Sequence, residues 1–412
     1  MTKITDIPAI RFKGFSDTWE QRKAIDIADY SKGNGYSKGD LTDAGTPIIL
    51  YGRLYTKYQF AISEVDTFAV PRNGAVYSQG NEVIVPASGE TAEDIARASA
   101  VEKSGVLLGG DLNILRPFDF INPLFLALAI SNGEPQKELA KKAQGKSVVH
   151  IHNTDIQEVT IAYPSRTEQD RIVSVFRQLD NLITLHQRKY DKLTNVKKSM
   201  LEKMFPQNGS NVPEIRFKGF TEAWEQRKFS ELVQIERGGS PRPIDDFITD
   251  APNGLNWVKI GDAPTQGNYI TKTAEKIRPE GLSKTREVHP GDLILSNSMS
   301  FGKPYIMGID GCIHDGWLLI RNTYGVFDLT FLCHLLGTPQ MLSQYRSLAA
   351  GSTVNNLNKE LVGNTYVTIP SITEQRVLGA YLEQLDNLIT LHQRELEKLK
   401  KLKKACLEKM FV

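Results

Sequence analysis

The sequence has little cysteine, no long apolar run and almost no net charge, and each absence excludes a class of protein. Its three cysteines, Cys312, Cys333 and Cys406, show neither metal-ligand spacing nor a paired framework, which predicts a protein of a reducing cytosol. Because there is no apolar stretch of about 18 residues and no signal peptide core, we expect a soluble cytoplasmic protein without membrane contact. The net charge of +2 excludes an overall basic nucleic-acid-binding protein, so any basic surface must be local.

Catalytic motifs are also lacking. Gly145–Ser147 resembles the end of a phosphate-binding loop, but Ala140 stands where that loop requires its leading glycine. Asn122–Phe125 is similar to an adenine methyltransferase motif, but its second proline is replaced by leucine and no glycine-rich cofactor loop precedes it. His150 and His152 have no evident third metal ligand. We therefore predict no catalytic residue, no metal and no cofactor in this chain.

What the sequence does contain is a duplication. Gln178–Arg188 and Gln384–Arg394 both read QLDNLITLHQR, and the shift between them is 384 − 178 = 206 residues. The match extends to other blocks, which are Thr167–Gln169 with Thr373–Gln375, Leu201–Phe205 with Leu407–Phe411, and Ile7–Phe15 with Val212–Phe220. A repeat of this length predicts two copies of one structural unit.

The repeated stretch has the period of a long helix. Apolar residues recur at steps of three and four for several heptads, and a helix from Glu168 to Met204 would be roughly 55 Å long at 1.5 Å per residue. A seam this long cannot be buried within a small globule. The sequence therefore predicts an intrachain antiparallel coiled coil between the two copies, with a pseudo-two-fold axis. The seam residues that this model pairs include Leu179, Leu182, Ile183 and His186 in the first copy, and Leu385, Leu388, Ile389 and His392 in the second.

Three further expectations concern these helices. His186 and His392 occupy equivalent seam positions, and we interpret them as a polar pair that fixes the register. Gly379 replaces Val173 of the first copy, which predicts a less regular start of the second helix. The alternative to a coiled coil is that each helix packs only on its own half, although identity at exposed as well as seam positions disfavours this.

Between the helices the chain changes character. Glycine and proline punctuate short β-rich runs, which predicts two α+β domains with mixed strands. The predicted organisation is a leader (1–22), a first globular domain (23–160), a first helical region (161–206), a linker with a repeated leader (207–228), a second globular domain (229–368) and a second helical region (369–412). The helices match between the halves and the domains do not, so the helices do one job twice and the domains do related but different jobs.

Polar, cation-bearing loops follow strands at matching places in the two domains. Such side chains suit hydrogen bonding to base edges, with Arg and Lys on phosphates and guanine, whereas the alternative is ordinary solvated loop chemistry. The candidate DNA-binding residues are Arg53, Tyr55, Lys57, Ser88, Thr91, Arg97, Gly110, Lys146 and Ser147 in the first domain, and Lys259, Asn297, Ser298, Ser300, Lys303, His314, Ser352 and Thr353 in the second.

With these motifs, the chain resembles the specificity subunit of type I restriction–modification systems. The resemblance rests on the order of domains and on the Pro-Ser-x-Thr-Glu-Gln segment followed by Gln-Leu-Asp-Asn-Leu-Ile, which occurs twice. It implies two target-recognition domains that each read one half of an interrupted DNA sequence. It also implies a non-catalytic subunit whose helices bind two methyltransferase subunits, which carry S-adenosylmethionine. The complex would also include restriction endonuclease subunits. The helix residues that we assign to subunit binding are Leu179, Leu182, Ile183, His186, Leu385, Leu388, Ile389 and His392.

Two other functions remain open from the residues. A coiled-coil adaptor with two protein-binding domains would share the helices but would not need the cation-bearing loops. An enzyme is disfavoured by the missing cofactor motifs.

Overall fold

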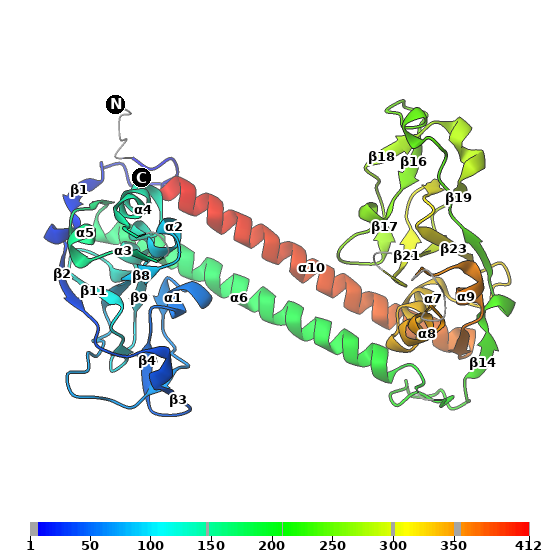
Figure 1. Ribbon diagram of the computed structural model, residues 1–412, viewed down its shortest axis with the longest axis horizontal. Coiled ribbons are helices and arrows are strands. Elements are labelled where there is room, and N and C mark those ends of the chain that lie inside the picture. Colours follow the sequence, from blue (N-terminus) through cyan, green and yellow to red (C-terminus); the bar gives the residue numbers. More distant parts are fainter. Residues whose placement is uncertain (1–6, 146–147, 208, 298–300, 350–355, 412) are drawn as a thin grey trace. The chain divides into compact units, whose positions relative to one another are not determined.

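The computed structural model describes residues 7–145, 148–207, 209–297, 301–349 and 356–411. The chain divides into two compact units: unit 1 comprises Met1–Thr184 and Glu397–Val412, and unit 2 comprises Leu185–Leu396 (Figure 1). Each unit contains one globular domain and segments of two long helices, which pass from one unit into the other.

The long helices are α6, Arg166–Lys203, and α10, Ile372–Met410. Backbone amides of the first turns bond back to serine carbonyls, as Gln169 does to Ser165 and Gln375 to Ser371, both at 3.0 Å. Neither helix contains proline, so nothing interrupts the hydrogen-bond ladder over 38 and 39 residues. The prediction of two long helices at the repeated stretches is confirmed.

The domain of unit 1 has a five-stranded sheet in the order β2-β11-β7-β9-β5 and a four-stranded sheet in the order β10-β4-β6-β3. The strands of the first sheet are β2 (Ala28–Lys32), β11 (Leu112–Pro117), β7 (Glu82–Pro86), β9 (Ser99–Val101) and β5 (Ala61–Ile62). Those of the second are β10 (Leu107–Leu108), β4 (Thr46–Ile49), β6 (Phe68–Ala69) and β3 (Leu41–Thr42). Two strand pairs complete the unit, β1 (Glu20–Lys23) with β13 (Thr160–Tyr163) and β8 (Ser88–Gly89) with β12 (Val149–His150).

Alternation along these strands builds a three-layered domain. Val83 and Val85 of β7 face the helix layer, whereas Ile84 between them faces the four-stranded sheet. The helix layer and the connections contain α1 (Arg53–Thr56), α2 (Ala92–Ile95), α3 (Pro123–Ile130), α4 (Gly133–Lys142) and α5 (Asn153–Gln157). Helix α3 lies buried against the five-stranded sheet because almost all of its residues are apolar.

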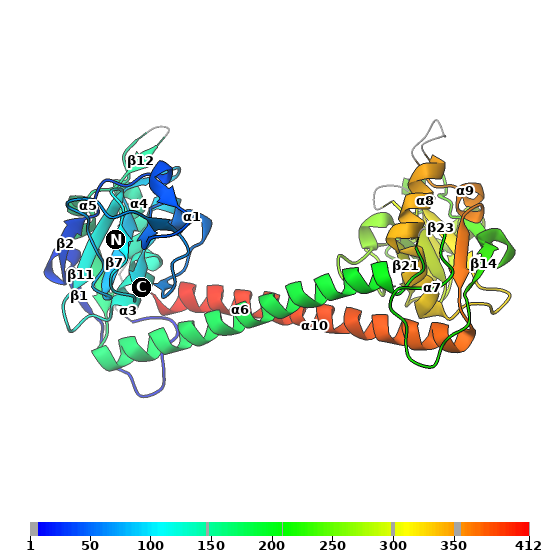
Figure 2. The same cartoon turned by 90° about the horizontal axis from the view of Figure 1, so that it is seen from below.

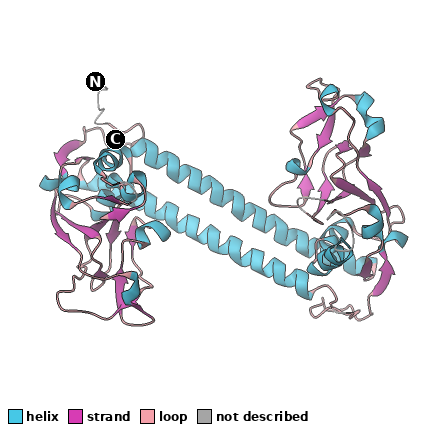
Figure 3. Ribbon diagram, in the orientation of Figure 1, coloured by secondary structure: helices cyan, strands magenta, loops and turns pink. Residues whose placement is uncertain are grey.

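The domain of unit 2 repeats this plan with other residues (Figures 2 and 3). Its five-stranded sheet has the order β15-β23-β20-β21-β17, with β15 (Gln234–Arg237), β23 (Trp317–Arg321), β20 (Leu293–Ser296), β21 (Pro304–Met307) and β17 (Tyr269–Ile270). Its four-stranded sheet is β18 (Glu275–Ile277), β16 (Leu255–Val258), β22 (Gly311–Ile313) and β19 (Arg286–Val288), and β14 (Glu225–Lys228) pairs with β24 (Tyr366–Ile369). The helices are α7 (Leu329–Leu336), α8 (Pro339–Ala349) and α9 (Lys359–Gly363).

Within each unit, segments of α6 and α10 pair antiparallel. In unit 1, Phe411 after the end of α10 packs on Phe176 near the start of α6 and on Phe125 of α3, at ring-centroid distances of 6.0 and 5.7 Å. In unit 2, Phe205 after the end of α6 stacks on Phe331 of α7, at 5.7 Å. Each domain core therefore includes the last residues of the other repeat's helix. The alternative that each helix packs only on its own half is wrong.

Repeat-equivalent residues meet along the helix pair. His186 and His392 face each other with 3.1 Å between their Nδ1 atoms, which confirms the predicted pairing. Burial and the neighbouring His186 lower the pKa of His392, which favours the neutral form of the His392 ring.

The seam prediction was wrong for Leu182 and Leu388, which are 43% and 44% exposed. The buried and half-buried residues of the seam step by three, four and three along α6, from Phe176 to Leu179, Ile183 and His186. Leu182 precedes a seam position by one residue and is therefore rotated by about 100° from it. The sequence pattern alone did not distinguish the seam from its flank.

The expected irregularity at Gly379 is also wrong, because α10 is continuous through this position. A Cβ atom at Gly379 would lie 2.5 Å from Oγ1 of Thr330 and 2.8 Å from the backbone nitrogen of Phe331. The glycine is needed where the start of α7 approaches α10, so it serves interhelical packing.

The repeated leaders fasten the ends of the helices. Arg11 donates two hydrogen bonds of 2.7 Å to the buried carboxylate of Glu168 in the first turn of α6. Arg216 does the same for Glu374 of α10, at 2.7 and 2.8 Å. Because a buried carboxylate requires a paired charge, these leaders are integral parts of the two units.

A half-length chain of residues 1–207 is expected to form a homodimer. Without α10, Phe176 and Leu179 lose their cover, at roughly 1.5–3 kcal/mol for each fully uncovered side chain. A second copy offers the same LEKMF segment, Leu201–Phe205, in place of Leu407–Phe411. Analytical ultracentrifugation measures the mass, with the full-length chain as control. A well-folded monomer would contradict the pseudo-two-fold pairing.

Candidate nucleic-acid interface

In unit 1 the structure brings four of the predicted residues together beside β8. The hydroxyl of Tyr55 donates to the backbone oxygen of Ser88 at 2.7 Å, and Thr91 accepts from the backbone nitrogen of Asp94 and so caps α2. The guanidinium of Arg97 lies 5.5 Å from the ring centroid of Tyr55. Burial raises the pKa of the Tyr55 phenol, which therefore stays protonated and acts as a donor.

Most cations of this set are engaged within the domain. Arg53 and Lys57 both contact Asp66, with nitrogen–oxygen distances of 2.5 Å, and hold the pKa of its carboxyl well below the usual range. Arg97 pairs with Asp94. Contact of these groups with phosphate therefore requires an exchange of partners, which the sequence did not reveal.

A glycine-rich loop that sequence reasoning missed lies beside Gly110. A Cβ atom at Gly110 would lie 3.0 Å from the backbone nitrogen of Gly35, and one at Gly33 would lie 1.8 Å from the oxygen of Gly109. The two backbones are in contact, which only glycine permits here. Unit 2 has the same contact between Gly238 and the oxygen of His314, at 2.2 Å.

In unit 2, Asn297 and His314 lie in one hydrogen-bonded loop cluster. Asn297 donates its side-chain amide to the oxygen of Asp315 at 2.8 Å. Nδ1 of His314 accepts from the backbone nitrogen of Gly316 at 2.9 Å, and its Nε2 lies 3.0 Å from Oδ1 of Asp315. Both ring nitrogens of His314 are thus used internally.

The same cluster presents a cation that was not predicted. Ser240 donates its hydroxyl to Asp315 at 2.9 Å, and the Arg242 side chain, 82% exposed, lies 3.8 Å from the same carboxylate. The signal in the sequence was the Gly-Gly-Ser-Pro-Arg run after a strand, which parallels Gly33–Ser37 in position.

The remaining cations of unit 2 differ in their engagement. Lys259 is bound to Glu275 at 2.5 Å. Lys303 lies 4.9 Å from the ring centroid of Tyr305, and no carboxylate of the described residues lies within ion-pair distance of it. Lys303 is therefore a cation of the predicted set that is available for a phosphate or base.

Six predicted residues lie outside the described residues: Lys146, Ser147, Ser298, Ser300, Ser352 and Thr353. Equivalent hydrogen bonds flank them in both units. Ile151 donates its backbone N–H to the oxygen of Ala87 at 3.1 Å, and Leu357 donates to that of Asn297 at 3.0 Å. These bonds join described residues at equivalent places in the two domains.

The predicted subunit-binding residues divide between two faces of the helices. Leu179, Leu385 and Ile389 are buried, and Ile183, His186 and His392 are half-buried. Leu182 and Leu388 are exposed, as are Leu185 and Leu391 one turn further along. The exposed leucines form the same pair in both repeats.

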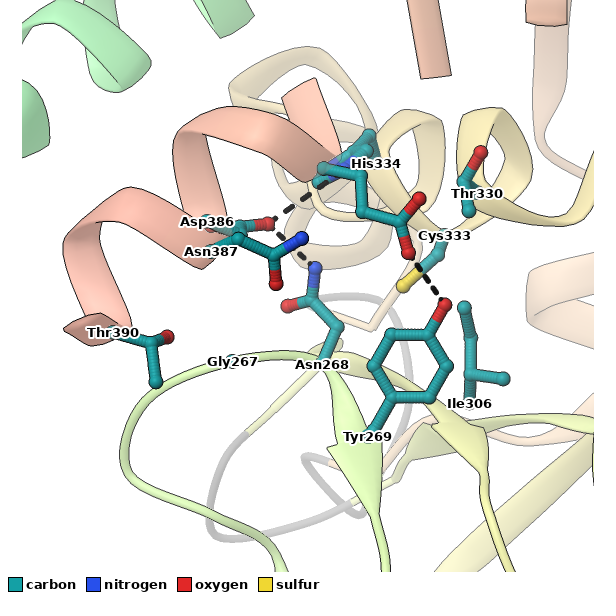
Figure 4. Close-up of a pocket in the computed structure, with 11 residues that line it drawn as sticks. Gly267, Asn268, Tyr269, Ile306, Thr330, Cys333, His334, Asp386, Asn387 and Thr390 are labelled. Atoms are coloured by element: carbon teal, nitrogen blue, oxygen red, sulfur yellow. Dashed lines mark hydrogen bonds and ion pairs between the residues drawn. The ribbon is translucent and has the colours of Figure 1, made fainter. Parts of the chain in front are cut away.

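A polar cluster joins the second domain to the helices of unit 2 (Figure 4). The carboxylate of Asp386 on α10 is paired with Lys197 of α6, accepts 2.8 Å from the amide of Asn268, and lies 3.6 Å from Nε2 of His334 on α7. A cavity of about 30 Å³ adjoins these side chains. Burial, with Lys197 nearby, lowers the pKa of His334 to about 4.

Sites of other kinds are lacking in the described part of the chain. No group of three or more His, Cys, Asp or Glu side chains is arranged to hold a metal ion there. Nor does any helix in these ranges have the length and apolarity needed to span a membrane.

Comparison with known proteins identifies the family. The model for the type I restriction modification DNA specificity domain matches residues 16–195 and 221–401. The chain belongs to this family. The matched segments cover most of both halves, so this specificity subunit carries the family's domain twice, as the internal repeat predicts.

Similar proteins agree with this assignment. The type I restriction enzyme MjaVIII specificity subunit of Methanocaldococcus jannaschii is 23% identical over 81% of this chain and 78% of its own length. The putative MjaX specificity subunit of the same organism is 24% identical over 73% and 70%. The crystal structure of the type I system S subunit from M. genitalium has the same fold, with a TM-score of 0.65 and 14% identity over 98% of this chain and 99% of that one.

The predicted function is therefore confirmed at the level of the family. The chain is a non-catalytic DNA-recognition subunit with two target-recognition domains. The adaptor and enzyme alternatives are wrong.

Replacing His334 by leucine, the residue that unit 1 has at the equivalent Leu128, is expected to flatten the pH dependence of stability. The folded pKa of about 4 lies below the ordinary 6.5, so the unfolded chain takes up this proton first as the pH falls. The free energy of unfolding is therefore highest above pH 6.5 and falls by about 3 kcal/mol as the pH is lowered towards 4.

Urea unfolding at several pH values measures this, followed by the fluorescence of Trp224, Trp257 and Trp317, which all lie in unit 2. The exposed His152→Gln variant is the control. If the free energy of unfolding had the same dependence on pH in the wild type and in His334→Leu, the role given to His334 would be contradicted.

Proposed function

We propose that each target-recognition domain reads one half of an interrupted, asymmetric DNA sequence through its clustered loops. The observation that carries this proposal is the duplication with divergence. The sheets, the flanking hydrogen bonds and the glycine contacts recur in both domains, whereas the polar side chains on the loops differ. A common frame with different base-contacting groups suits two different half-sites.

Within the first domain, the proposed contacts come from the loops beside β8 and Gly110, with Ser88 and Thr91 at hydrogen-bonding positions. Arg97 is paired with Asp94, so it contacts DNA only by exchanging that partner. Within the second they come from the cluster of Asn297, His314 and Arg242, with Lys303 close by in sequence. Groups already paired to carboxylates, such as Arg53 and Lys259, shape the loops. Unpaired cations are the better candidates for phosphate, because no internal partner has to be displaced.

The proposed protein partners are two methyltransferase subunits, together with restriction endonuclease subunits that join the assembly. S-adenosylmethionine belongs to the methyltransferase partner. The exposed pairs Leu182 with Leu185 and Leu388 with Leu391 support this proposal, because contiguous exposed leucines at i and i+3 on a helix are typical of a buried interface. Two copies of one surface suit two copies of one partner.

The Lys303→Ala substitution tests DNA reading by the second domain. Methylation mapping in a host carrying the chain and its partners first defines the sequence. Binding to duplexes in which one half of that sequence is scrambled then shows which half each domain contacts. We expect weaker binding to every sequence and a salt slope smaller by about one, as for a lost phosphate contact.

The matched control for this experiment is Lys57→Ala, an exposed lysine that is paired with Asp66. Its affinity and salt slope are expected to remain close to those of the wild type. An unchanged DNA affinity of the Lys303→Ala variant would argue against the proposed interface. Equal binding of the wild-type chain to all duplexes would do the same.

The double substitution Leu388→Ser and Leu391→Ser tests the partner surface. Both side chains are exposed, so folding is expected to be unaffected, and the number of methyltransferase subunits bound should fall from two to one. Loss of an apolar interface anchor costs more than about 1 kcal/mol, or roughly fivefold in affinity. Native mass spectrometry counts the subunits.

The control is Leu402→Ser, because Leu402 is exposed on α10 but lies outside the repeated pair. Two subunits still bound at equal affinity by the double variant would exclude this surface as the docking site.

A further inference from the structure

The same Asp–Lys pair occurs in both units and meets different domain residues. In unit 1 Asp180 of α6 is paired with Lys403 of α10, and in unit 2 Asp386 of α10 is paired with Lys197 of α6. Both shifts equal the repeat length, since 386 − 180 = 206 and 403 − 197 = 206. The helix side of the contact is therefore invariant within the chain.

The domain side differs at positions whose equivalence the backbone establishes. The nitrogen of Ala100 bonds to the oxygen of Phe60 at 2.8 Å, and in unit 2 the nitrogen of Ile306 bonds to the oxygen of Asn268 at 2.7 Å. Phe60 thus corresponds to Asn268. By the same repeat length, Leu128 of α3 corresponds to His334 of α7.

In unit 1 the domain meets the lysine of the pair through an aromatic ring. The ammonium of Lys403 lies 5.7 Å from the ring centroid of Phe60, and Leu128 is buried in the core. Among the described residues, the hydrogen bond to the Asp180 carboxylate comes from Lys403. This cation–π contact engages the lysine of the pair and leaves the carboxylate of Asp180 without a bond to a described side chain of the domain.

In unit 2 the contact is directional. Asp386 accepts from Asn268 and Lys197 and lies beside His334, and its side chain is only 13% exposed (Figure 4). Two further bonds tie the same loop to both helices: Tyr269 donates to Glu383 at 2.7 Å, and Gln266 donates to the hydroxyl of Tyr190 at 2.9 Å. Buried charge-assisted hydrogen bonds restrict geometry more than apolar contact does.

We propose that Asp386 is a positioning residue for DNA recognition, which fixes the second target-recognition domain on the helix pair through Asn268 and His334. The first domain meets the equivalent pair through Phe60 and Lys403, so it does not depend on Asp180 in this way. The inference rests on the proposed function, because it states that the contact at Asp386 positions the domain that is proposed to read the second half-site.

The test uses the full chain assembled with its methyltransferase partner and duplexes carrying the mapped sequence. Discrimination at each half-site is the ratio of Kd for a duplex with one base pair changed to Kd for the mapped duplex, and spacers one base pair longer and shorter are included. The variants are Asp386→Asn, its repeat-equivalent control Asp180→Asn, and Asn268→Ala. The last removes the domain contact and keeps the ion pair, so it remains informative if Asp386→Asn folds poorly.

Asp386→Asn is expected to lower discrimination at the second half-site by about tenfold and to relax the spacer requirement, with discrimination at the first half-site changed less than about twofold. Asn268→Ala should shift the same half-site in the same direction. Asp180→Asn should leave both ratios within about twofold of wild type.

Rescue separates positioning from general stability. The pair of substitutions Asn268→Phe and His334→Leu installs the side chains of unit 1, and in that background Asp386→Asn should lose most of its effect on the second half-site. A purely structural role would make the triple variant worse instead.

Equal effects of Asp386→Asn on both half-sites, or no effect of both Asp386→Asn and Asn268→Ala, would overturn the inference while leaving the proposed function intact. A wild-type complex that fails to discriminate its own mapped sequence would overturn the proposed function itself.

Discussion

Each globular domain of this protein depends on the last residues of the other repeat's helix. Met410 and Phe411 are buried in the core of unit 1, and Met204 and Phe205 in that of unit 2. Both helices are too long for one domain to cover, and each domain has a hydrophobic surface that its own helix leaves open. Exchange of the ends satisfies both needs, so neither half can complete its core alone.

That exchange explains where sequence was duplicated and where it was free to diverge. The helix ends, the leaders and the buried Arg–Glu pairs recur because each must fit the same partner in both units. The domain loops are not under this constraint. The domains therefore differ in many of their side chains, including those that meet the helices, such as Phe60 against Asn268 and Leu128 against His334.

Two kinds of polar group need to be distinguished in the recognition loops. Asp66 with Arg53 and Lys57, and Asp315 with Ser240 and His314, fix loop shape through internal bonds. Arg242 is largely exposed at 3.8 Å from the Asp315 carboxylate, and Lys303 has no carboxylate of the described residues within ion-pair distance. A loop that is internally satisfied presents its remaining donors in a defined geometry, which is the physical requirement for reading base edges.

The sequence by itself determined the repeat, the two long helices, the α+β character of the two domains, and membership of a family of DNA-reading subunits. These follow from local period and from identity between halves, which need no knowledge of distant contacts. It misplaced Leu182 and Leu388 on the seam, because a leucine beside the seam fits the same heptad pattern. It also misread Gly379, because the reason for this glycine is the close approach of another helix, α7. Only the tertiary structure decided that Arg53 and Arg97 are held by carboxylates, that Asp386 meets Asn268 and His334, and which leucines remain exposed. Each of these depends on residues far apart in the chain, whose pairing is fixed by packing and charge compensation in three dimensions.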